Sequence, residues 1–164
     1  LGVTPAPRPA EALRYCDAGL AVGDLASGAL SQVWRSRRKA IAAFLALTTL
    51  GTLGYFTVGA RSGSAFLACC AVSGLGAGYW AVFVTSAAEQ FGTNLRATVT
   101  TTAPNVVRGA LVPMTFAYAK ARAAWGIVPG AIAVGVGVLA LAVGALALLD
   151  ETHGRDLDFV DDDA

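Results

Sequence analysis

The amino-acid sequence predicts an all-α fold, a polytopic bundle of membrane-spanning helices, and three observations support this prediction. Hydrophobic residues make up 55% of the 164 residues and charged residues only 14%, whereas about 25% are charged in an average soluble protein. The mean hydropathy is +0.60. The charges gather in clusters between uncharged runs of about 20 residues, the length of a helix that crosses a bilayer. Five spans of about 20 residues, separated by short loops, would leave a soluble protein without a polar outer shell, so we expect five transmembrane helices in a membrane protein.

The first three predicted spans follow one another with short connections. The first span, residues 15–33, is the least apolar because it contains a carboxylate in its middle. The second span, residues 40–58, has no charge, and a short turn separates it from the third, residues 65–88. Such a turn predicts an antiparallel hairpin. Residues 1–14 are rich in proline, and we expect them to form an extracytoplasmic loop.

The last two predicted spans differ sharply in polarity. The fourth, residues 99–119, contains three consecutive threonines, an arginine and two prolines. This content is typical of a helix that faces protein or water rather than lipid. The fifth, residues 127–149, is an uncharged run of alanine, valine, leucine and glycine. Residues 150–164 then form an acidic tail, which we expect to be soluble and cytoplasmic.

A cluster of basic residues at the end of the first span predicts the orientation of the chain. Four cations occupy five positions there, at Arg35, Arg37, Arg38 and Lys39. Basic residues concentrate in the cytoplasmic loops of membrane proteins. The sequence therefore predicts a multi-pass protein of the cytoplasmic or plasma membrane with a cytoplasmic carboxy-terminus.

The sequence contains no pattern that predicts an enzyme, a metal site or a nucleic-acid-binding surface. The three cysteines form no C-x-x-C pair and no ligand set with the single histidine. We find no nucleophile with its base and no phosphate-binding loop. The net charge is only +1, so nothing favours nucleic acid as a partner. We expect no catalytic residue, no metal and no cofactor.

Polar and aromatic residues inside the predicted spans are the candidates for a functional role. An ionised carboxylate such as Asp24 costs about 2.5–3.5 kcal/mol in mid-membrane on insertion scales, so it should face a cavity or a partner. Asp24 therefore either has a gating or coupling role or pairs with a cation, for which Arg108 of the fourth span is the best candidate. Tyr79 and Trp80 lie too deep for an interfacial aromatic belt. They either pack in the core or line a substrate path.

Glycines recur at a spacing that favours close helix packing. The pairs are Gly19 with Gly23, Gly74 with Gly78, and Gly126 with Gly130. Small residues four apart allow two helix backbones to approach closely in lipid. The alternative for any single pair is that membrane helices simply tolerate glycine.

The basic loop after the first span resembles a motif of the major facilitator superfamily (MFS) of transporters. Residues 28–32, Gly-Ala-Leu-Ser-Gln, followed by Arg-Ser-Arg-Arg at 35–38, are similar to the pattern G-x-x-x-D-R-x-G-R-R. Gln32 replaces the aspartate of that motif, Ser36 replaces its glycine, and one extra residue is present.

Three further segments resemble sugar and organic-ion transporters of the same superfamily. Residues 88–98, Ala-Glu-Gln-Phe-Gly-Thr-Asn-Leu-Arg-Ala-Thr, are similar to E-x-F-P-T-x-x-R-A-T, with Gly92 in place of proline. Asn105 and Arg108, the latter followed by glycine, resemble N-x-x-R-G. The tail Glu-Thr-His-Gly-Arg at 151–155 is similar to the ending E-T-K-G-R.

This resemblance implies a partial MFS fold, helices eight to twelve of twelve, in which the amino-terminal half is missing. It implies a secondary transporter, such as a symporter, that moves a sugar-like solute or organic acid by alternating access, coupled to a proton or sodium ion. The expected partners are membrane lipid, the solute, the ion and the missing half. A membrane-embedded receptor that binds without transport is the alternative. A charge network is implied at Gly28, Arg35, Arg37, Arg38, Glu89 and Arg96, and cavity or coupling positions at Asp24, Arg108, Asn105, Tyr79 and Trp80.

Overall fold

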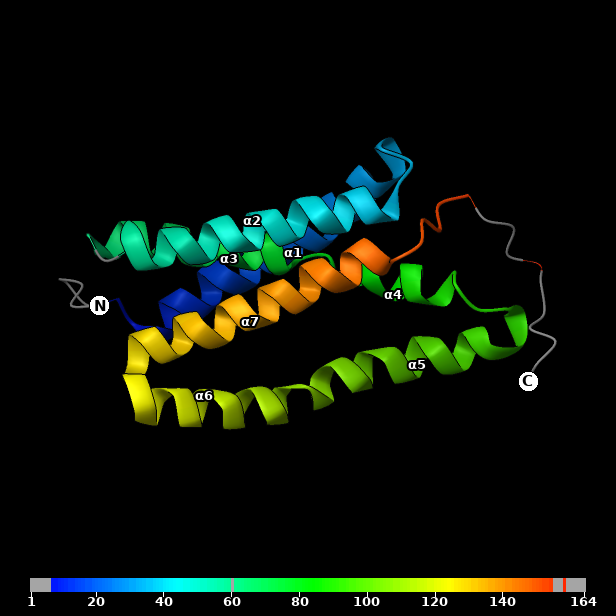
Figure 1. Ribbon diagram of the computed structural model, residues 1–164. Coiled ribbons are helices and arrows are strands. Elements are labelled where there is room, and N and C mark those ends of the chain that lie inside the picture. Colours follow the sequence, from blue (N-terminus) through cyan, green and yellow to red (C-terminus); the bar gives the residue numbers. More distant parts are fainter. Residues whose placement is uncertain (1–6, 60, 155–157, 159–164) are drawn as a thin grey trace. The chain divides into compact units, whose positions relative to one another are not determined.

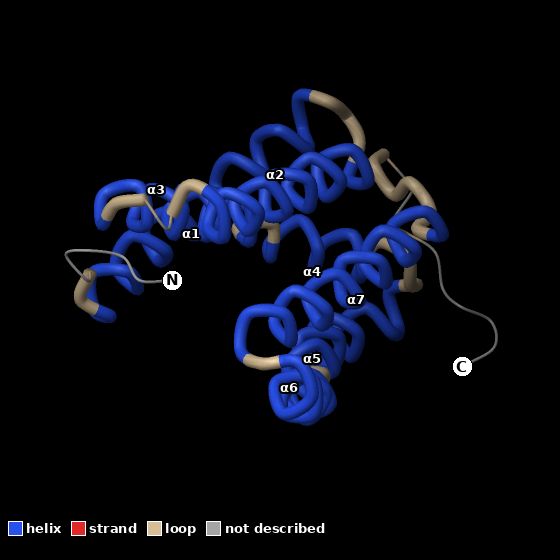
Figure 2. Tube along the Cα trace, turned by 60° about the vertical axis from the view of Figure 1, so that its left-hand side comes forward, coloured by secondary structure: helices blue, strands red, loops and turns tan. Residues whose placement is uncertain are grey.

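The computed structural model describes residues 7–59, 61–154 and 158, and within them every regular element is a helix (Figure 1, Figure 2). The all-α prediction is therefore confirmed. The seven helices in the described part of the chain are α1 Pro9–Val33, α2 Arg37–Thr57, α3 Gly63–Ala77, α4 Trp80–Ala88, α5 Thr93–Gly109, α6 Leu111–Trp125 and α7 Ile127–Leu148.

The chain divides into two compact units, which we describe one at a time. Unit 1 extends to Ser86 and includes the short segment Glu151–Gly154. It contains α1, α2, α3 and most of α4. Unit 2 contains the chain from Ala87 to Asp150, with α5, α6 and α7. The segment after α7 therefore returns to the unit formed by the first helices.

In unit 1, α1 and α3 pack backbone against backbone through glycines. A Cβ atom added at Gly78 would lie 2.5 Å from the Cα of Gly23 and 2.6 Å from the amide nitrogen of Asp24. An added Cβ at Gly74 would collide with the backbone of Cys16, and one at Gly19 would collide with the backbone of α3. The interpretation of Gly19, Gly23, Gly74 and Gly78 as packing positions is thus confirmed.

The opposite side of α3 packs against α2 in the same manner. An added Cβ at Gly76 would lie 2.5 Å from the amide nitrogen of Thr48, and one at Gly51 would lie 2.8 Å from the Ser73 hydroxyl. Close approach on both sides places α3 between α1 and α2, and the three helices lie side by side (Figure 1). Van der Waals contact between closely approaching backbones is the stabilising interaction expected in lipid, where apolar burial contributes little.

The third predicted span is not one continuous helix. Residues 65–88 were expected as a single span, but α3 ends at Ala77 and α4 begins at Trp80. Gly78 has φ −78° and ψ 58°, outside the helical region. The Tyr79 amide donates a hydrogen bond to the Ala77 carbonyl at 2.9 Å, whereas a helical amide would donate to the carbonyl four residues earlier. The helix is interrupted where Gly78 lies against Gly23.

The fourth predicted span is also wrong in its bounds. In place of one span at 99–119, unit 2 has α5 and α6, which meet at Ala110. A proline ring clashes with the carbonyl four residues before it. Pro113 would clash in this way inside a helix, but the break leaves it in the first turn of α6, where its missing N–H is no loss. Pro104 remains inside α5. The segments between the last predicted spans, residues 89–98 and 120–126, are also largely helical, because α5 begins at Thr93 and α6 continues to Trp125.

The turn between α6 and α7 depends on glycine. Gly126 has φ +92° and ψ 175°, a conformation that L-residues rarely adopt. Gly130 packs on the last turns of α6, where an added Cβ would lie 2.8 Å from the Arg122 amide nitrogen. The third glycine pair thus combines one turn residue and one packing residue, and only Gly130 acts as predicted.

Three helical segments of the described chain are long and apolar enough to cross a membrane. They are Arg37–Thr57, Gly63–Ala88 and Ile127–Leu148, which correspond to the second, third and fifth predicted spans. α1 is long, but it contains Glu11, Arg14, Asp17 and Asp24. α5 and α6 have 17 and 15 residues. A membrane protein is consistent with these findings.

The two ends of the predicted bundle differ in detail from the expectation. Residues 1–14 were expected as a loop, yet α1 begins at Pro9, a residue favoured in the first turn of a helix. Of the expected tail 150–164, Glu151–Gly154 packs with unit 1. The remainder of both predictions, residues 1–6, 155–157 and 159–164, lies outside the described residues.

Candidate functional site

The connection between α1 and α2, at the basic cluster, is a tight turn with an unusual residue in it. The Arg35 amide bonds the Gln32 carbonyl at 3.2 Å, and the Ser36 amide bonds the Ser31 carbonyl at 3.2 Å. These two bonds form the Schellman motif that closes many helices, and its left-handed position is normally glycine. Here Arg35 occupies it, with φ +49°.

Ser36, which the family resemblance treats as a departure from the motif, is the N-cap of α2. It is buried and has an extended backbone, and its hydroxyl oxygen accepts a hydrogen bond from the Lys39 amide at 3.1 Å. A glycine at this position would have no side chain to cap the helix. The substitution therefore gives this loop an interaction that the motif glycine could not make.

The carboxylate of Glu151 binds at this same helix end. Ser36 donates its hydroxyl to Glu151 Oε2, and the Arg37 amide donates to Oε1 at 2.8 Å. The amides of Thr152 and His153 donate to Oε1 at 3.1 Å each. We call these hydrogen bonds, with the further one from the Arg38 amide, the Glu151 contact. The positive end of the α2 dipole favours an anion here.

The Glu151 contact stabilises the ionised form of the carboxylate. Burial by itself raises the pKa of Glu151, but the hydrogen bonds from Ser36 and from the amides of His153, Arg37 and Arg38 outweigh it and lower the pKa below its ordinary value. The next residue, Thr152, is only 1% exposed. The segment after α7 is thus held in unit 1 by the charged side chain of Glu151 and by the buried residue Thr152.

Buried serines connect the basic loop to α1. Arg37 donates from Nη1 to the Ser31 hydroxyl at 2.8 Å, and Ser31 donates to the Gly28 carbonyl at 2.9 Å. Ser31 and Ser27 are completely buried. An added Cβ at Gly28 would meet no atom within 4 Å, so Gly28 is not required here for close packing.

Asp24 has a partner that the sequence did not reveal. Its Oδ1 accepts a hydrogen bond from the Trp80 amide at 3.1 Å. Trp80 is the first residue of α4, so Asp24 on α1 accepts from one of the amides at the start of α4 that have no partner within the helix. The carboxylate and the helix interruption lie together inside unit 1. The predicted pairing with Arg108 joins two units, and it stays a prediction.

The two aromatic residues at the interruption differ in exposure. Tyr79 is half-buried, and Trp80 is 38% exposed. The Trp80 ring packs against Phe83, with centroids 5.6 Å apart. Both alternatives for these residues, core packing and a role in a substrate path, stay predictions.

Arg96 closes the turn between α4 and α5. Its side chain donates to the carbonyl of Ala88 at 3.4 Å and to that of Phe91 at 3.2 Å. Cations near a helix C-terminus satisfy its free carbonyls in this way. Glu89, in the same turn, is buried. The predicted network between this turn and the basic loop joins two units and stays a prediction.

Asn105 and Arg108 form a local pair on the exposed side of α5. Arg108 donates from Nη1 to Asn105 Oδ1 at 3.2 Å, and Asn105 donates to the Thr101 carbonyl at 3.0 Å. The spacing N-x-x-R places both side chains on one helix face. The motif thus describes a pair within one helix.

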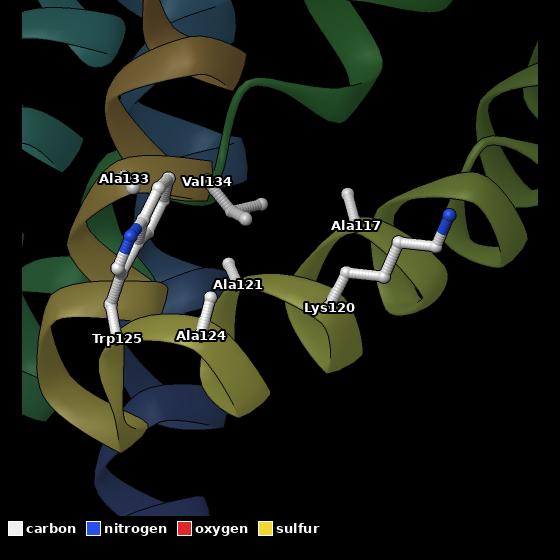
Figure 3. Close-up of a pocket in the computed structure, with 7 residues that line it drawn as sticks. All are labelled: Ala117, Lys120, Ala121, Ala124, Trp125, Ala133 and Val134. Carbon is white, nitrogen blue, oxygen red and sulfur yellow. The ribbon is translucent and has the colours of Figure 1, made fainter.

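An apolar groove follows one face of the α6–α7 hairpin. At its wider end it has a volume of about 670 Å³ and is lined by residues of α6 and α7 such as Met114 and Leu141. A second hollow of about 460 Å³ shares Ala117 and Val134 with it and extends to Trp125 (Figure 3). Figure 3 shows the Lys120 side chain extending away from Trp125.

Glu151 and Ser36 are the residues that the sequence-based list of site positions omitted. Both residues lie within segments that resemble MFS motifs, but nothing in the sequence indicated that these two segments are in contact. Glu151 contacts the backbone amides of Arg37 and Arg38, and the predicted charge network that includes Arg35, Arg37 and Arg38 stays a prediction. Within the described residues, no group of three or more His, Cys, Asp or Glu side chains could hold a metal ion.

No protein-family model, curated protein or solved structure matches this chain. The similarity to MFS transporters therefore depends on the motifs alone.

Proposed function

We propose that this chain is the carboxy-terminal part of an MFS-type secondary transporter, with five membrane helices corresponding to helices eight to twelve. It moves a small organic solute, sugar-like or acidic, together with a proton or sodium ion. The observation that supports the proposal best is the Glu151 contact. It joins the basic loop after α1 to the start of the tail motif, two segments quoted independently for their resemblance to one family.

In this proposal the Glu151 contact acts in gating. It ties the chain after α7 to the start of α2, on the side assigned to the cytoplasm. A contact of this kind need not contribute much to overall stability, because a contact that exists in only one of two states biases the equilibrium between them. Breaking the contact would favour the state in which these ends separate.

Asp24 is the proposed coupling residue. It accepts the amide of Trp80 at an interrupted helix, and discontinuous helices are where transporters bind substrates and ions. A protonated carboxyl is a weaker acceptor than a carboxylate. Protonation of Asp24 would therefore loosen the start of α4, which gives the ion a means of changing the helix.

The gating proposal is tested by uptake into proteoliposomes that contain the full-length transporter. Glu151→Gln, Glu89→Gln and Arg96→Gln should each lower the uptake rate while the protein remains folded. Glu11→Gln, which removes a carboxylate from the first turn of α1, is the control and should transport normally. Normal uptake by the first three variants would refute the gating role, and ligand binding without flux in the wild type would favour a receptor.

The coupling proposal needs two variants of Asp24. Asp24→Asn retains an oxygen that can accept the Trp80 amide but has no titratable group, so it should lose proton-driven uptake and retain exchange. Asp24→Ala loses both properties and should be impaired in exchange as well. Wild-type pH dependence of uptake in Asp24→Asn would exclude Asp24 as the coupling residue.

A further inference from the structure

A groove at the junction of α1 and α2 is lined by side chains that only donate hydrogen bonds. The cavity has a volume of about 430 Å³ and is lined by Trp34, Lys39, Ala42 and Ala43. An indole N–H and an ammonium group donate but do not accept. The two alanines add no polar atom. A ligand of this groove must therefore bring acceptors.

Two of the four basic residues at 35–39 are available to bind an anion beside the groove. Arg37 uses its backbone amide in the Glu151 contact and its side chain to donate to Ser31. Within the described residues, the side chains of Arg35 and Lys39 have no hydrogen-bonding or ionic partner, and both are exposed. Glu151 occupies the backbone amides at the start of α2, so an added anion would bind the side chains.

With α2 across a membrane, the groove would lie near the lipid headgroups. α2 is one of the helices able to span a membrane, and Lys39 lies in its first turn. Ala42 and Ala43 lie three and four residues further on, on the same helix face as Lys39 and about one turn, or about 5 Å, deeper. Trp34 is 44% exposed at the other side of the groove, and tryptophan is typical of the membrane interface.

We propose that this groove binds the headgroup of an anionic phospholipid. Its phosphate accepts from Lys39 and Trp34, Arg35 adds to the positive potential, and the glycerol and first acyl carbons lie along Ala42 and Ala43. A zwitterionic lipid also has a phosphate, but its choline group is repelled by the cations. The proposal depends on the membrane location of α2 and not on transport, so it stands or falls separately from the proposed function.

The first experiment measures lipid affinity by native mass spectrometry of the purified chain in detergent. Phosphatidylglycerol should bind more tightly than phosphatidylcholine. Lys39→Gln should lower the affinity for the first bound phosphatidylglycerol molecule by about fivefold, the effect of one basic residue near a charged membrane surface. Lys39→Arg should retain binding. Lys120→Gln is the matched control, since Lys120 also lines a hollow beside a tryptophan, and it should leave the affinity unchanged.

A second measurement locates the lipid. Fluorescence of the wild type minus that of Trp34→Phe isolates the emission of Trp34, and brominated phosphatidylglycerol should quench it more than brominated phosphatidylcholine does. Ala42→Leu fills part of the groove without changing the charge and should weaken phosphatidylglycerol binding. Circular dichroism checks that each variant retains its helix content.

Several results would overturn the proposal. Equal affinity for the two lipids, or equal weakening by Lys39→Gln and Lys120→Gln, would leave only attraction by overall charge. Unchanged binding by Ala42→Leu would exclude the groove as the place. Displacement of the lipid by excess inorganic phosphate would assign the site to a free anion, and displacement by an acidic peptide would assign it to a protein partner.

Discussion

The two units of the chain are packed by different means. In unit 1 glycines bring α3 against α1 on one side and against α2 on the other, and each of α1, α2 and α3 has buried residues. In unit 2 α5 has no buried residue, α6 buries only Ala121 and α7 only Gly130. Unit 1 therefore contains its own packing, whereas unit 2 presents most of its helix surface to its surroundings.

Large apolar side chains are exposed in both units. Leu25 and Val33 of α1 are 78% and 77% exposed, and Leu141 and Leu148 of α7 are 76% and 87% exposed. The difference between the units therefore lies in how much their helices bury. Unit 2, whose helices bury the fewest residues, should depend on lipid or protein for its stability more than unit 1 does, and paired substitutions in the two units test this.

The largest effect is expected for a methyl group placed between α1 and α3. Gly78→Ala puts a Cβ 2.5 Å from the backbone of Gly23, and overpacking of this kind costs about 1–3 kcal/mol. Gly137→Ala in α7 meets no atom within 4 Å and should leave stability unchanged or higher. The measurement is the midpoint of thermal unfolding, followed by size-exclusion chromatography after heating. Equal effects would contradict the packing described for unit 1.

The next effect concerns two helix-connecting turns with positive φ, at Arg35 in unit 1 and at Gly126 in unit 2. Unit 2 has glycine at its turn, and Gly126→Ala should cost about 1–3 kcal/mol. Unit 1 has Arg35, so Arg35→Gly should stabilise the chain by about 1 kcal/mol relative to Arg35→Ala, which removes the charge without relieving the strain. Thermal midpoints of the three variants provide the test. A midpoint of Arg35→Gly below that of Arg35→Ala would exclude strain at this turn.

A smaller effect is expected at the side chain that holds α4. Asp24→Ala removes the acceptor of the Trp80 amide and should cost about 1 kcal/mol, as other caps do. In unit 2, Asn105→Ala breaks a contact within one exposed helix, worth about 0.2–0.5 kcal/mol. Hydrogen exchange of the first amides of α4 should rise in Asp24→Ala alone. Unaltered exchange there would show that Asp24 does not cap the helix.

The smallest effect is the pH dependence of the Glu151 contact. Because its pKa is lowered in the folded chain, Glu151 contributes stability above its ordinary pKa of about 4.3 and loses it as the pH falls through the folded value. Wild type should therefore exceed Glu151→Gln in thermal midpoint near neutral pH by a small margin, and the difference should vanish in acid. A difference that grew in acid would contradict the lowered pKa.

Patterns that depend on one helix alone were predictable from sequence. The uncharged runs at 40–58 and 127–149 predicted the bounds of α2 and α7 to within three residues at each end. The four-residue spacing of glycines identified four packing positions, Gly19, Gly23, Gly74 and Gly78. The interruption at Gly78 was not predicted, because the third span is apolar throughout and glycine is common in membrane helices. Pro113 signalled the break at Ala110, but prolines in membrane helices do not always end them.

Contacts between distant segments were less predictable. Asp24 was expected either to act in gating or coupling or to pair with a cation such as Arg108, and the partner observed within unit 1 is a backbone amide. Every residue except proline has a backbone amide, so the sequence cannot show which amide Asp24 binds. Glu151 was identified only as part of a tail motif. Its partner is the N-terminus of α2, 114 residues earlier in the sequence. A helix N-terminus binds anions through its backbone amides, and no pattern of side chains reveals such a site.

The position of α3 between two helices limits how this part of the molecule can move. Rotation of α3 about its own axis would turn a larger side chain toward the backbone of α1 or α2, because glycines are present on both of its contacting sides. Sliding of α3 along its axis would likewise bring a larger residue next to each glycine against the same backbone. α1, α2 and α3 should therefore move together, and a change of α4 relative to them would begin after Gly78, at Tyr79, where the hydrogen bond from the Trp80 amide to Asp24 limits its extent.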